Sequence, residues 1–352
     1  MTKMVVKNVV GIDVAQQELV VTVGSMDADL NTQIIGSKVF KNTLTAFEKL
    51  VQWVNKMTKN SPVPRYVMEA TGVYHESLAY WLDKRGLEVS IVLPNKISSY
   101  ARTLTVKTVT DKTASEAIML FGLERKLDRW SRPDPTYKKL RQLCRERGQL
   151  IVERTGLKNQ LHAENAEAEP NKQSIERTNK RINLLNKQEK EISQEISVLI
   201  KEKPELNNNI TLICSIPGVS VLTAATVLAE TNGFELIKSK RQITSYAGLD
   251  VKEKQSGTTV KGKPRISKKG NRYIRKAMYM PALAALRYND RFKAVYARLV
   301  ARHGIKMKAG VAVQRKLLEM MFTIFKTQTP FDRNYLKKQN NRLQKISGTT
   351  KM

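Results

Sequence analysis

The sequence contains few of the residues from which disulfide frameworks and zinc sites are built. Its 352 residues include two cysteines, Cys144 and Cys214, and three histidines. The two cysteines are far apart, and neither has a second thiol near it in the sequence. We therefore expect two reduced, structural thiols of a cytosolic protein rather than a disulfide or zinc framework.

Long apolar runs are absent as well. No stretch of about 18 apolar residues could span a bilayer, and Met1 is not followed by a charged and then apolar leader. The hydrophobic fraction of 41% is nevertheless far above that of a disordered chain, and 352 residues suffice for two or three domains. These features predict a soluble, folded, intracellular protein.

Acidic residues are scarce relative to basic ones. The chain has 62 Lys and Arg against 32 Asp and Glu, which gives a net charge of +30. Such a charge predicts a polyanionic partner, most simply nucleic acid, bound with a salt-dependent affinity. An anionic membrane surface is the competing partner.

The first third of the chain alternates strand and helix patterns. The sequence predicts strands within residues 5–23 (two, joined by a tight turn), 65–68 and 87–93, and helices over 44–57, after Gly72 and from 111. Strands that alternate with helices favour an α/β domain.

Three carboxylates stand out in this region. Asp13 lies inside an apolar strand, Glu69 follows a later strand, and Asp111 opens a helix. Clustered oxygen ligands of this kind bind hard divalent cations, and such a site could assist phosphodiester chemistry. Asp13 could also be an ordinary polar residue at a strand end. The sequence alone leaves open whether the three converge.

The middle of the chain has the pattern of a helical arm. Residues 131–135 form a turn-rich boundary, 137–162 are polar and helical, and 175–199 carry a heptad pattern. Six of its eight a and d positions are aliphatic: Ile175, Ile182, Leu185, Ile192, Ile196 and Leu199. A helical coiled-coil arm and an amphipathic helix packed on its own domain are both compatible with this pattern. A coiled coil would favour self-association.

The last third is predicted to be helical, with one basic loop. Ile216-Pro217-Gly218 resembles the turn of a helix-hairpin-helix element, whose backbone N–H groups meet a phosphate; the alternative is a structural turn between buried helices. Helices are predicted over 274–286, kinked or split by Pro281, and over 293–303 and 308–325. Residues 331–352 are predicted to be a disordered basic tail.

The basic loop lies between Lys252 and Lys276, where ten Lys or Arg face one acid and glycines impose turns. We expect it to bind nucleic acid through Lys252, Lys254, Lys261, Lys263, Arg265, Lys268, Lys269, Arg272 and Arg275, together with Gly218 of the hairpin. Ser256 is a candidate nucleophile for attack on phosphorus, although a serine before a glycine is more often a turn residue or a phosphate donor. Ser267 is the second choice.

Seven motifs in this order resemble the DEDD transposases of insertion sequence family 110. They are Gly11-Ile12-Asp13, Glu69-Ala70-Thr71-Gly72, Thr110-Asp111-Lys112, Ile216-Pro217-Gly218-Val219, Tyr246-Ala247-Gly248-Leu249, Gln255-Ser256-Gly257 and Ile266 to Arg272. Each motif alone is weak, but the ordered set is specific and covers roughly residues 8 to 325.

The residues and the resemblance together predict four segments. Residues 1–130 would be an α/β RuvC-like domain of ribonuclease-H fold, 131–205 the coiled-coil arm, 206–330 a mainly α transposase domain with the helix-hairpin-helix-like element, and 331–352 the tail. The resemblance implies that Asp13, Glu69 and Asp111 bind Mg²⁺ and that Ser256 forms a covalent link to DNA.

The resemblance also implies partners. Family members are similar to recombinases guided by a structured (bridge) RNA that pairs with donor and target DNA, and they assemble as a dimer of dimers. The expected location is the bacterial cytoplasm, at the nucleoid. No histidine lies near Ser256 in the sequence, so we predict a composite site in which the carboxylate-bound metal acts next to the serine.

One residue departs from the family pattern. The family has an Asp one helical turn after the third carboxylate, whereas this chain has Ala114, which cannot bind metal. The chain is then either a catalytically impaired copy or one in which residue 114 was replaced to trap an intermediate, and we favour the second hypothesis.

Two other functions remain as alternatives. A metal-dependent, structure-specific endonuclease of the Holliday-junction type would need the carboxylates but not Ser256. A non-catalytic nucleic-acid-binding scaffold would explain the charge and the arm, but not a carboxylate in an apolar strand.

Overall fold

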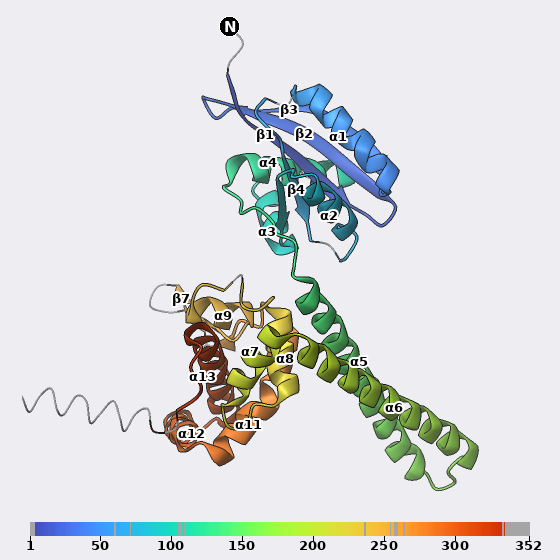
Figure 1. Cartoon of the computed structure of the whole chain (residues 1–352), viewed down its shortest axis with the longest axis vertical. Helices are drawn as coiled ribbons and strands as arrows, with labels where there is room; N and C mark the ends of the chain where they lie inside the picture. Colours follow the sequence, from blue (N-terminus) through green and yellow to red (C-terminus); the bar gives the residue numbers. More distant parts are fainter. Residues whose placement is uncertain are drawn as a thin grey trace, which may run out of the picture. The chain divides into compact units, whose positions relative to one another are not determined.

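In the computed structural model the chain forms two compact units, Met1–Arg132 and Pro133–Met352 (Figure 1). It describes residues 4–59, 61–70, 72–104, 108, 110–235, 237–253, 255–256, 260–262, 265–332 and 334. Lys254, Lys263, Gly257 and nearly all of the predicted tail lie outside the described residues, as do the side chains of Ser256 and Lys261. Within the described ranges, no helix has the length and apolar character needed to cross a membrane.

The first unit is built on a five-stranded sheet with the order β3-β2-β1-β4-β5. Its strands are β1 (Val5–Val14), β2 (Glu18–Asp27), β3 (Thr32–Lys41), β4 (Arg65–Glu69) and β5 (Val89–Val92). The first three form an antiparallel meander, and β4 and β5 continue the sheet in parallel with β1. The predicted α/β character is confirmed. The edge strand β3 was not predicted.

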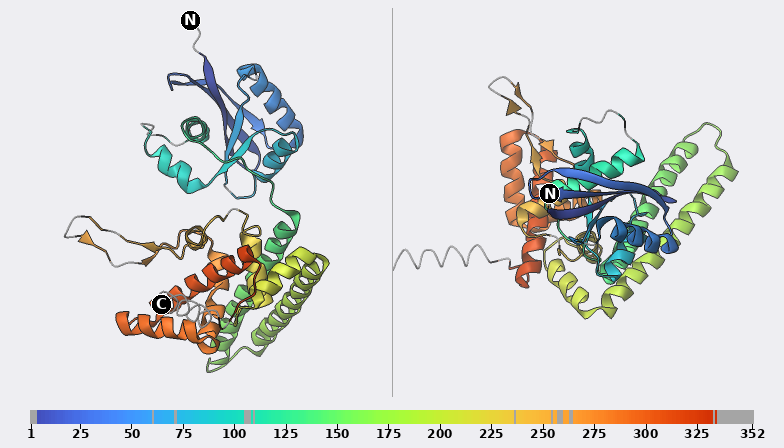
Figure 2. Two further views of the ribbon diagram at one scale, coloured as in Figure 1. Left: turned by 60° about the vertical axis from the view of Figure 1, so that its left-hand side comes forward. Right: turned by 90° about the horizontal axis from the view of Figure 1, so that it is seen from above.

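Helices cover both faces of this sheet, as the left view of Figure 2 shows. The helices of the unit are α1 (Leu44–Thr58), α2 (Glu76–Lys84), α3 (Pro94–Ala101) and α4 (Asp111–Glu124). Alternate residues of β1 serve the two layers: Val10 and Ile12 pack in the core with α1 and α2, whereas Val9 packs in the core with α3 and α4.

The second unit begins with two 31-residue helices that lie side by side as a hairpin, α5 (Pro135–Asn165) and α6 (Lys172–Glu202). Asp134 and Asn171 cap their first turns. Glu189 is the acid at an a position of the predicted heptad, and it is tolerated there because Arg147 and Arg154 of α5 both pair with its carboxylate. Coiled-coil packing with a second chain stays a prediction.

The rest of this unit is helical around one large core that includes Phe234, Ile243 and Phe322. Its helices are α7 (Pro204–Cys214), α8 (Val221–Glu230), α9 (Lys240–Tyr246), α10 (Arg272–Ala277), α11 (Tyr279–Tyr288), α12 (Asp290–His303) and α13 (Lys306–Thr327). The predicted split near Pro281 is confirmed, because α10 ends before Met278 and Pro281 lies in the first turn of α11, where a missing N–H costs nothing. Both cysteines are free.

The basic segment is not simply looped, as the sequence predicted. It forms an antiparallel ribbon in which β6 (Val251–Lys252) pairs with β9 (Arg265–Ile266) and β7 (Gln255–Ser256) pairs with β8 (Val260–Lys261). Figure 2 shows this ribbon extending away from the helices of its unit. The glycines that predicted turns did not reveal the strand pairing, because each paired segment is two residues long.

Candidate functional site

Asp13 and Glu69 lie next to each other at the ends of two neighbouring parallel strands. The recorded register of β1 and β4 runs to the pair Ile12 and Met68. One residue further on, the same register brings Asp13 beside Glu69, the last residue of β4. Both residues are half-buried. Parallel pairing therefore explains why two carboxylates 56 positions apart in the sequence meet at one edge of the sheet.

Both carboxylates are on the face of the sheet that α4 covers. A side chain at Gly122 of α4 would run into Val9 of β1 and Val67 of β4, so these two valines point toward α4. Asp13 is four residues after Val9, and Glu69 is two after Val67. Because alternate residues of a strand point to the same face, both carboxylates share that face.

The start of α4 adds the third carboxylate. Gly11 lets this helix approach β1 closely, because a Cβ there would overlap the Ser115 carbonyl oxygen and the Met119 amide nitrogen. Asp111, the first residue of α4, precedes Ser115 by one helical turn. Thr110 caps the helix by accepting a hydrogen bond from the Thr113 N–H, at 3.2 Å. Gly11, the small residue of the Gly-Ile-Asp motif, thus allows the helix that carries Asp111 to lie close to β1.

The three carboxylates act on one another electrostatically. Burial raises the pKa of Asp13 above its ordinary value, and the negative charges of Asp111 and then Glu69 raise it further, while the Val14 backbone N–H opposes the shift. Even so, among the described residues no three Asp, Glu, His or Cys side chains are close enough to hold an ion together. An all-carboxylate set of this kind fits a hard divalent cation, whose charge would offset the repulsion.

Ala114 lies one turn after Asp111 on α4 and is half-buried. Its methyl group offers no ligand at the place where the family pattern has an Asp. Glu116, the next acid on this helix, is 4.0 Å from the Lys112 ammonium and is paired with it. Asp13, Glu69 and Asp111 are therefore the carboxylates that this edge offers, and their joint binding of a metal stays a prediction.

The base of the basic ribbon is held closed by polar contacts. The Ser267 hydroxyl donates to the Asp250 carboxylate at 2.6 Å, and the Ser267 N–H donates to the Asp250 carbonyl at 2.8 Å. The Arg275 guanidinium donates from one nitrogen to the carbonyl oxygens of Ala247, at 2.7 Å, and Gly270, at 3.0 Å. Ser267, the second-choice nucleophile, and Arg275, an expected nucleic-acid contact, thus both stabilise the ribbon base.

A buried carboxylate that the sequence analysis missed connects this base to the arm. Glu230, whose side chain is 1% exposed, accepts two hydrogen bonds from Arg145 of α5, at 2.7 and 2.8 Å. It also accepts one from the Asn271 amide, at 2.6 Å, and its backbone carbonyl accepts one from the Tyr246 hydroxyl, at 2.9 Å. The hydrogen bond to Glu230 raises the pKa of Arg145 above its ordinary value.

We call Glu230, Arg145, Tyr246 and Asn271 the Glu230 hub. A glutamate that ends the otherwise uncharged α8 was the signal in the sequence, but its partners are 85, 16 and 41 residues away. Asn271 also caps α10 through the N–H groups of Tyr273 and Ile274. The hub therefore fixes both ends of the ribbon, residues 246–250 and 267–272, relative to α5 and α8.

The other expected nucleic-acid contacts fall into two groups. Cationic side chains exposed on and after the ribbon are Lys252, Arg265, Lys268, Lys269 and Arg272. Gly218 instead has a backbone φ of +91°, and a Cβ there would lie 2.9 Å from that of Ala284 on α11. Close packing on α11 is thus one reason for glycine at the predicted hairpin, and its contact with phosphate stays a prediction.

Comparisons with known proteins agree with this arrangement. A family model described as "Transposase", of the DEDD type of IS110, matches residues 10–164, and one described as "Transposase IS116/IS110/IS902 family" matches residues 210–297. The chain is 28% identical to a pilin gene-inverting protein of Moraxella bovis over 84% of this chain and 90% of that one. It is also 28% identical to a pilin gene-inverting protein of Moraxella lacunata, over 93% and 98% of the two chains.

A solved structure, RuvC of Thermus thermophilus in complex with a Holliday junction substrate, is 12% identical and covers 35% of this chain and 99% of its own, with a TM-score of 0.27. The strand order of the first unit and the DEDD transposase match together identify a ribonuclease-H-like domain, in which chemistry depends on a divalent metal. Matches in both units, in the expected order, show that the chain belongs to the IS110 family of transposases.

Proposed function

We propose that this transposase cuts and rejoins donor and target DNA through a covalent phosphoserine intermediate at Ser256, guided by a structured RNA encoded by its element. The observation that carries the proposal is the pairing of two features in one chain: a set of mutually repelling carboxylates and a cationic ribbon that bears a serine on β7. The relatives named as gene-inverting proteins support it, because inversion requires every broken strand to be rejoined.

The proposed chemistry conserves the phosphodiester bond energy. The Ser256 oxygen forms a bond to phosphorus as the bond from phosphorus to a sugar oxygen breaks, and the serine proton passes to a base. The released sugar hydroxyl of another strand then attacks the phosphoserine, which restores the serine and joins the DNA. Exposed cations of the ribbon, such as Lys252 and Arg265, stabilise the charge on the phosphate.

The carboxylates have a separate role. Asp13, Glu69 and Asp111 are the proposed ligands of Mg²⁺, whose charge would offset both their mutual repulsion and their repulsion of the DNA phosphates. When bound, the ion would polarise the reacting phosphate and its leaving oxygen. Because the carboxylates belong to the first unit and Ser256 to the second, the proposed site is composite, drawn from one subunit or two.

We propose that the functional assembly is a dimer of dimers and that the arm takes part in self-association. Aliphatic side chains on the arm remain exposed: Val152 on α5, and Leu184 and Val198 on α6. Side chains of this type on a long hairpin are suited to a partner helix of the same kind.

The test is a recombination assay with purified protein, Mg²⁺, the element-encoded RNA, and donor and target DNA. Ala114→Asp restores the fourth carboxylate and should raise the yield of joined DNA strongly, because residue 114 follows Asp111 by one turn of α4. Ser256→Ala should abolish joined product while DNA binding is retained. Clean nicks in both variants, without joined product, would instead make the chain a metal-dependent endonuclease that uses water.

A further inference from the structure

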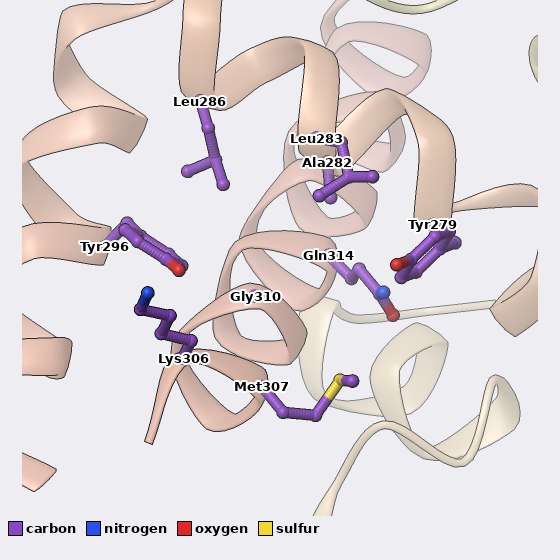
Figure 3. A pocket seen from close by; sticks show the side chains of 9 residues that line it. All are labelled: Tyr279, Ala282, Leu283, Leu286, Tyr296, Lys306, Met307, Gly310 and Gln314. Atoms are coloured by element: carbon purple, nitrogen blue, oxygen red, sulfur yellow. The ribbon is translucent and has the colours of Figure 1, made fainter. Parts of the chain in front are cut away.

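The helices that follow the ribbon enclose a pocket for which the proposed chemistry has no use. It lies between α11, α12 and α13 and has a volume of about 170 Å³ (Figure 3). Ala282, Leu283 and Leu286 of α11 and Gly310 of α13 line its apolar part. Drug-sized ligands occupy pockets of about 300 Å³ or more, so this one suits a single small ring system rather than a large cofactor.

Two tyrosines stand at opposite ends of this pocket. Figure 3 shows Tyr296 with its hydroxyl directed toward the Lys306 ammonium at one end, and Tyr279 beside the Gln314 amide at the other. Tyr279 is 47% exposed, although it borders a cavity. The exposed ring of Tyr279 offers a stacking surface for a flat ligand, and Lys306 at the other end could meet negative charge on that ligand.

Gln314 supplies a second, independent observation. Its side chain belongs to a residue that is only 8% exposed, yet the amide forms no hydrogen bond with any described residue. The amide atoms are not among the buried polar atoms that lack a partner, so solvent reaches them, and water or a ligand in the pocket can bond to them. The amide offers one acceptor and two donors in a plane, which matches the edge of a nucleobase.

Lys306 is the charged residue that lines the pocket, and the stretch of sequence that contains the pocket helices α11 and α12 is strongly basic. Between Arg272 and Lys308 the chain has ten Lys or Arg and one acid, Asp290. Two copies of this face would repel each other, whereas the phosphates of a nucleic acid strand would be attracted. The combination of stacking tyrosines, a planar amide and surrounding cations is typical of single-strand binding sites.

We propose that the pocket of α11, α12 and α13 accepts one unpaired nucleobase of a single strand whose phosphates lie on the surrounding cations. This inference depends on the proposed function in one respect, namely that the partner is nucleic acid. It requires neither Ser256 nor the carboxylates, so binding measured without metal tests it separately from the reaction.

A substitution at Gly310 can fill the pocket without a clash. A Cβ added at Gly310 would meet nothing within 4 Å, so Gly310→Leu should place its side chain in the cavity without disturbing the helix. Gly156 on α5 has the same open surroundings and lies on the arm, which makes Gly156→Leu the matched control. Tyr279→Ala removes one stacking ring and provides a second, independent variant.

The measurement is fluorescence anisotropy of the full-length chain in EDTA at physiological salt. The probes are short single strands of DNA and of RNA and, for each, a strand of equal length and charge in which every base is absent. The wild type and Gly156→Leu should bind the strands with bases about tenfold more tightly than the abasic strands. Gly310→Leu and Tyr279→Ala should lose that difference while keeping the affinity for abasic strands, and the DNA and RNA arms show which strand the pocket takes.

Two results would overturn the proposal. One is equal affinity of the wild type for strands with and without bases, which would leave charge alone as the basis of binding. The other is a Gly310→Leu variant that binds like Gly156→Leu but differs in mass by sedimentation, which would make the pocket a contact between copies of the chain.

Discussion

The carboxylate edge of the first unit and the basic ribbon of the second are built in opposite ways. Asp13 and Glu69 stand at the ends of central, buried strands, and the Gly11 contact fixes α4 against them. The ribbon consists of strand pairs only two residues long, and among the described residues its side-chain hydrogen bonds lie at its base. Rigid secondary structure positions the acids, whereas a distant hydrogen-bonded hub positions the cations.

This difference suggests a division of labour. A metal site needs ligands held within narrow limits, and a sheet edge provides them. A segment that must follow a DNA backbone benefits from a firm base. A substitution in one unit tests how that unit positions its charges, and the other unit, left unchanged, serves as the internal reference.

The largest effect is expected at Asp13. In the Ala114→Asp protein, Asp13→Asn should lower recombination by at least about a hundredfold. It should also raise the thermal stability of the metal-free protein, because the raised pKa of Asp13 means that its ionised form opposes folding. Melting curves with and without Mg²⁺ check this: the ion should stabilise the wild type and not the variant. The exposed Asp128→Asn should change neither property.

Next in size is the contact at Gly11. Gly11→Ala should destabilise the protein by about 3 kcal/mol, since its Cβ would overlap the backbone of α4. Gly148→Ala on α5, where a Cβ meets nothing within 4 Å, should instead stabilise by about 0.5–1 kcal/mol. Urea unfolding of both variants measures the difference, and equal stabilities would mean that α4 is not packed on β1 at this point.

A somewhat smaller loss is expected at the hub. Glu230→Ala should cost about 2–3 kcal/mol, because Arg145 and Asn271 lose their partner and Arg145 is partly exposed. Recombination should fall further than binding to non-specific DNA, since the cations remain but the ribbon base is released. A proportional loss of both would show that the hub serves stability alone. Glu319→Ala, which removes a more exposed ion pair on α13, is the control.

The smallest effect concerns thiol reactivity. Burial raises the pKa of both Cys144 and Cys214 to about 11, so at pH 8 each should react with a thiol reagent about a hundredfold more slowly than an unperturbed cysteine. The rate should rise as pH increases toward 11. Because the negative charge of Glu230 adds to the effect of burial on the pKa of Cys144, Glu230→Ala should accelerate labelling of Cys144 and leave Cys214 unchanged, as peptide mapping would reveal.

The sequence predicted the parts of the fold that depend on local pattern. The buried strands β1, β4 and β5 and the helices α12 and α13 follow from apolar periodicity. The strand β3 was missed because most of its residues are exposed and its pattern includes Gly36 and Lys38. The ribbon was missed because pairs of two residues carry no periodic signal.

The candidate site shows the same limit. Asp13, Glu69 and Asp111 could be chosen from the sequence, since a carboxylate at a strand or helix end is a visible irregularity. Their proximity depended on parallel register and on the glycine beneath α4, which are properties of the fold. The Glu230 hub joins residues up to 85 positions apart, and no local pattern marks Arg145 or Asn271 as its partners.

The most direct measurement is a search for DNA covalently bound to protein. The Ala114→Asp protein is incubated with Mg²⁺, RNA and paired DNA substrates, and the products are separated on a denaturing gel with and without protease. The account predicts a protease-sensitive shift of labelled DNA, mapped by mass spectrometry to the peptide with Ser256 and absent from the same protein carrying Ser256→Ala. A shift that persists in that variant, or joined DNA formed without any adduct, would contradict the serine intermediate.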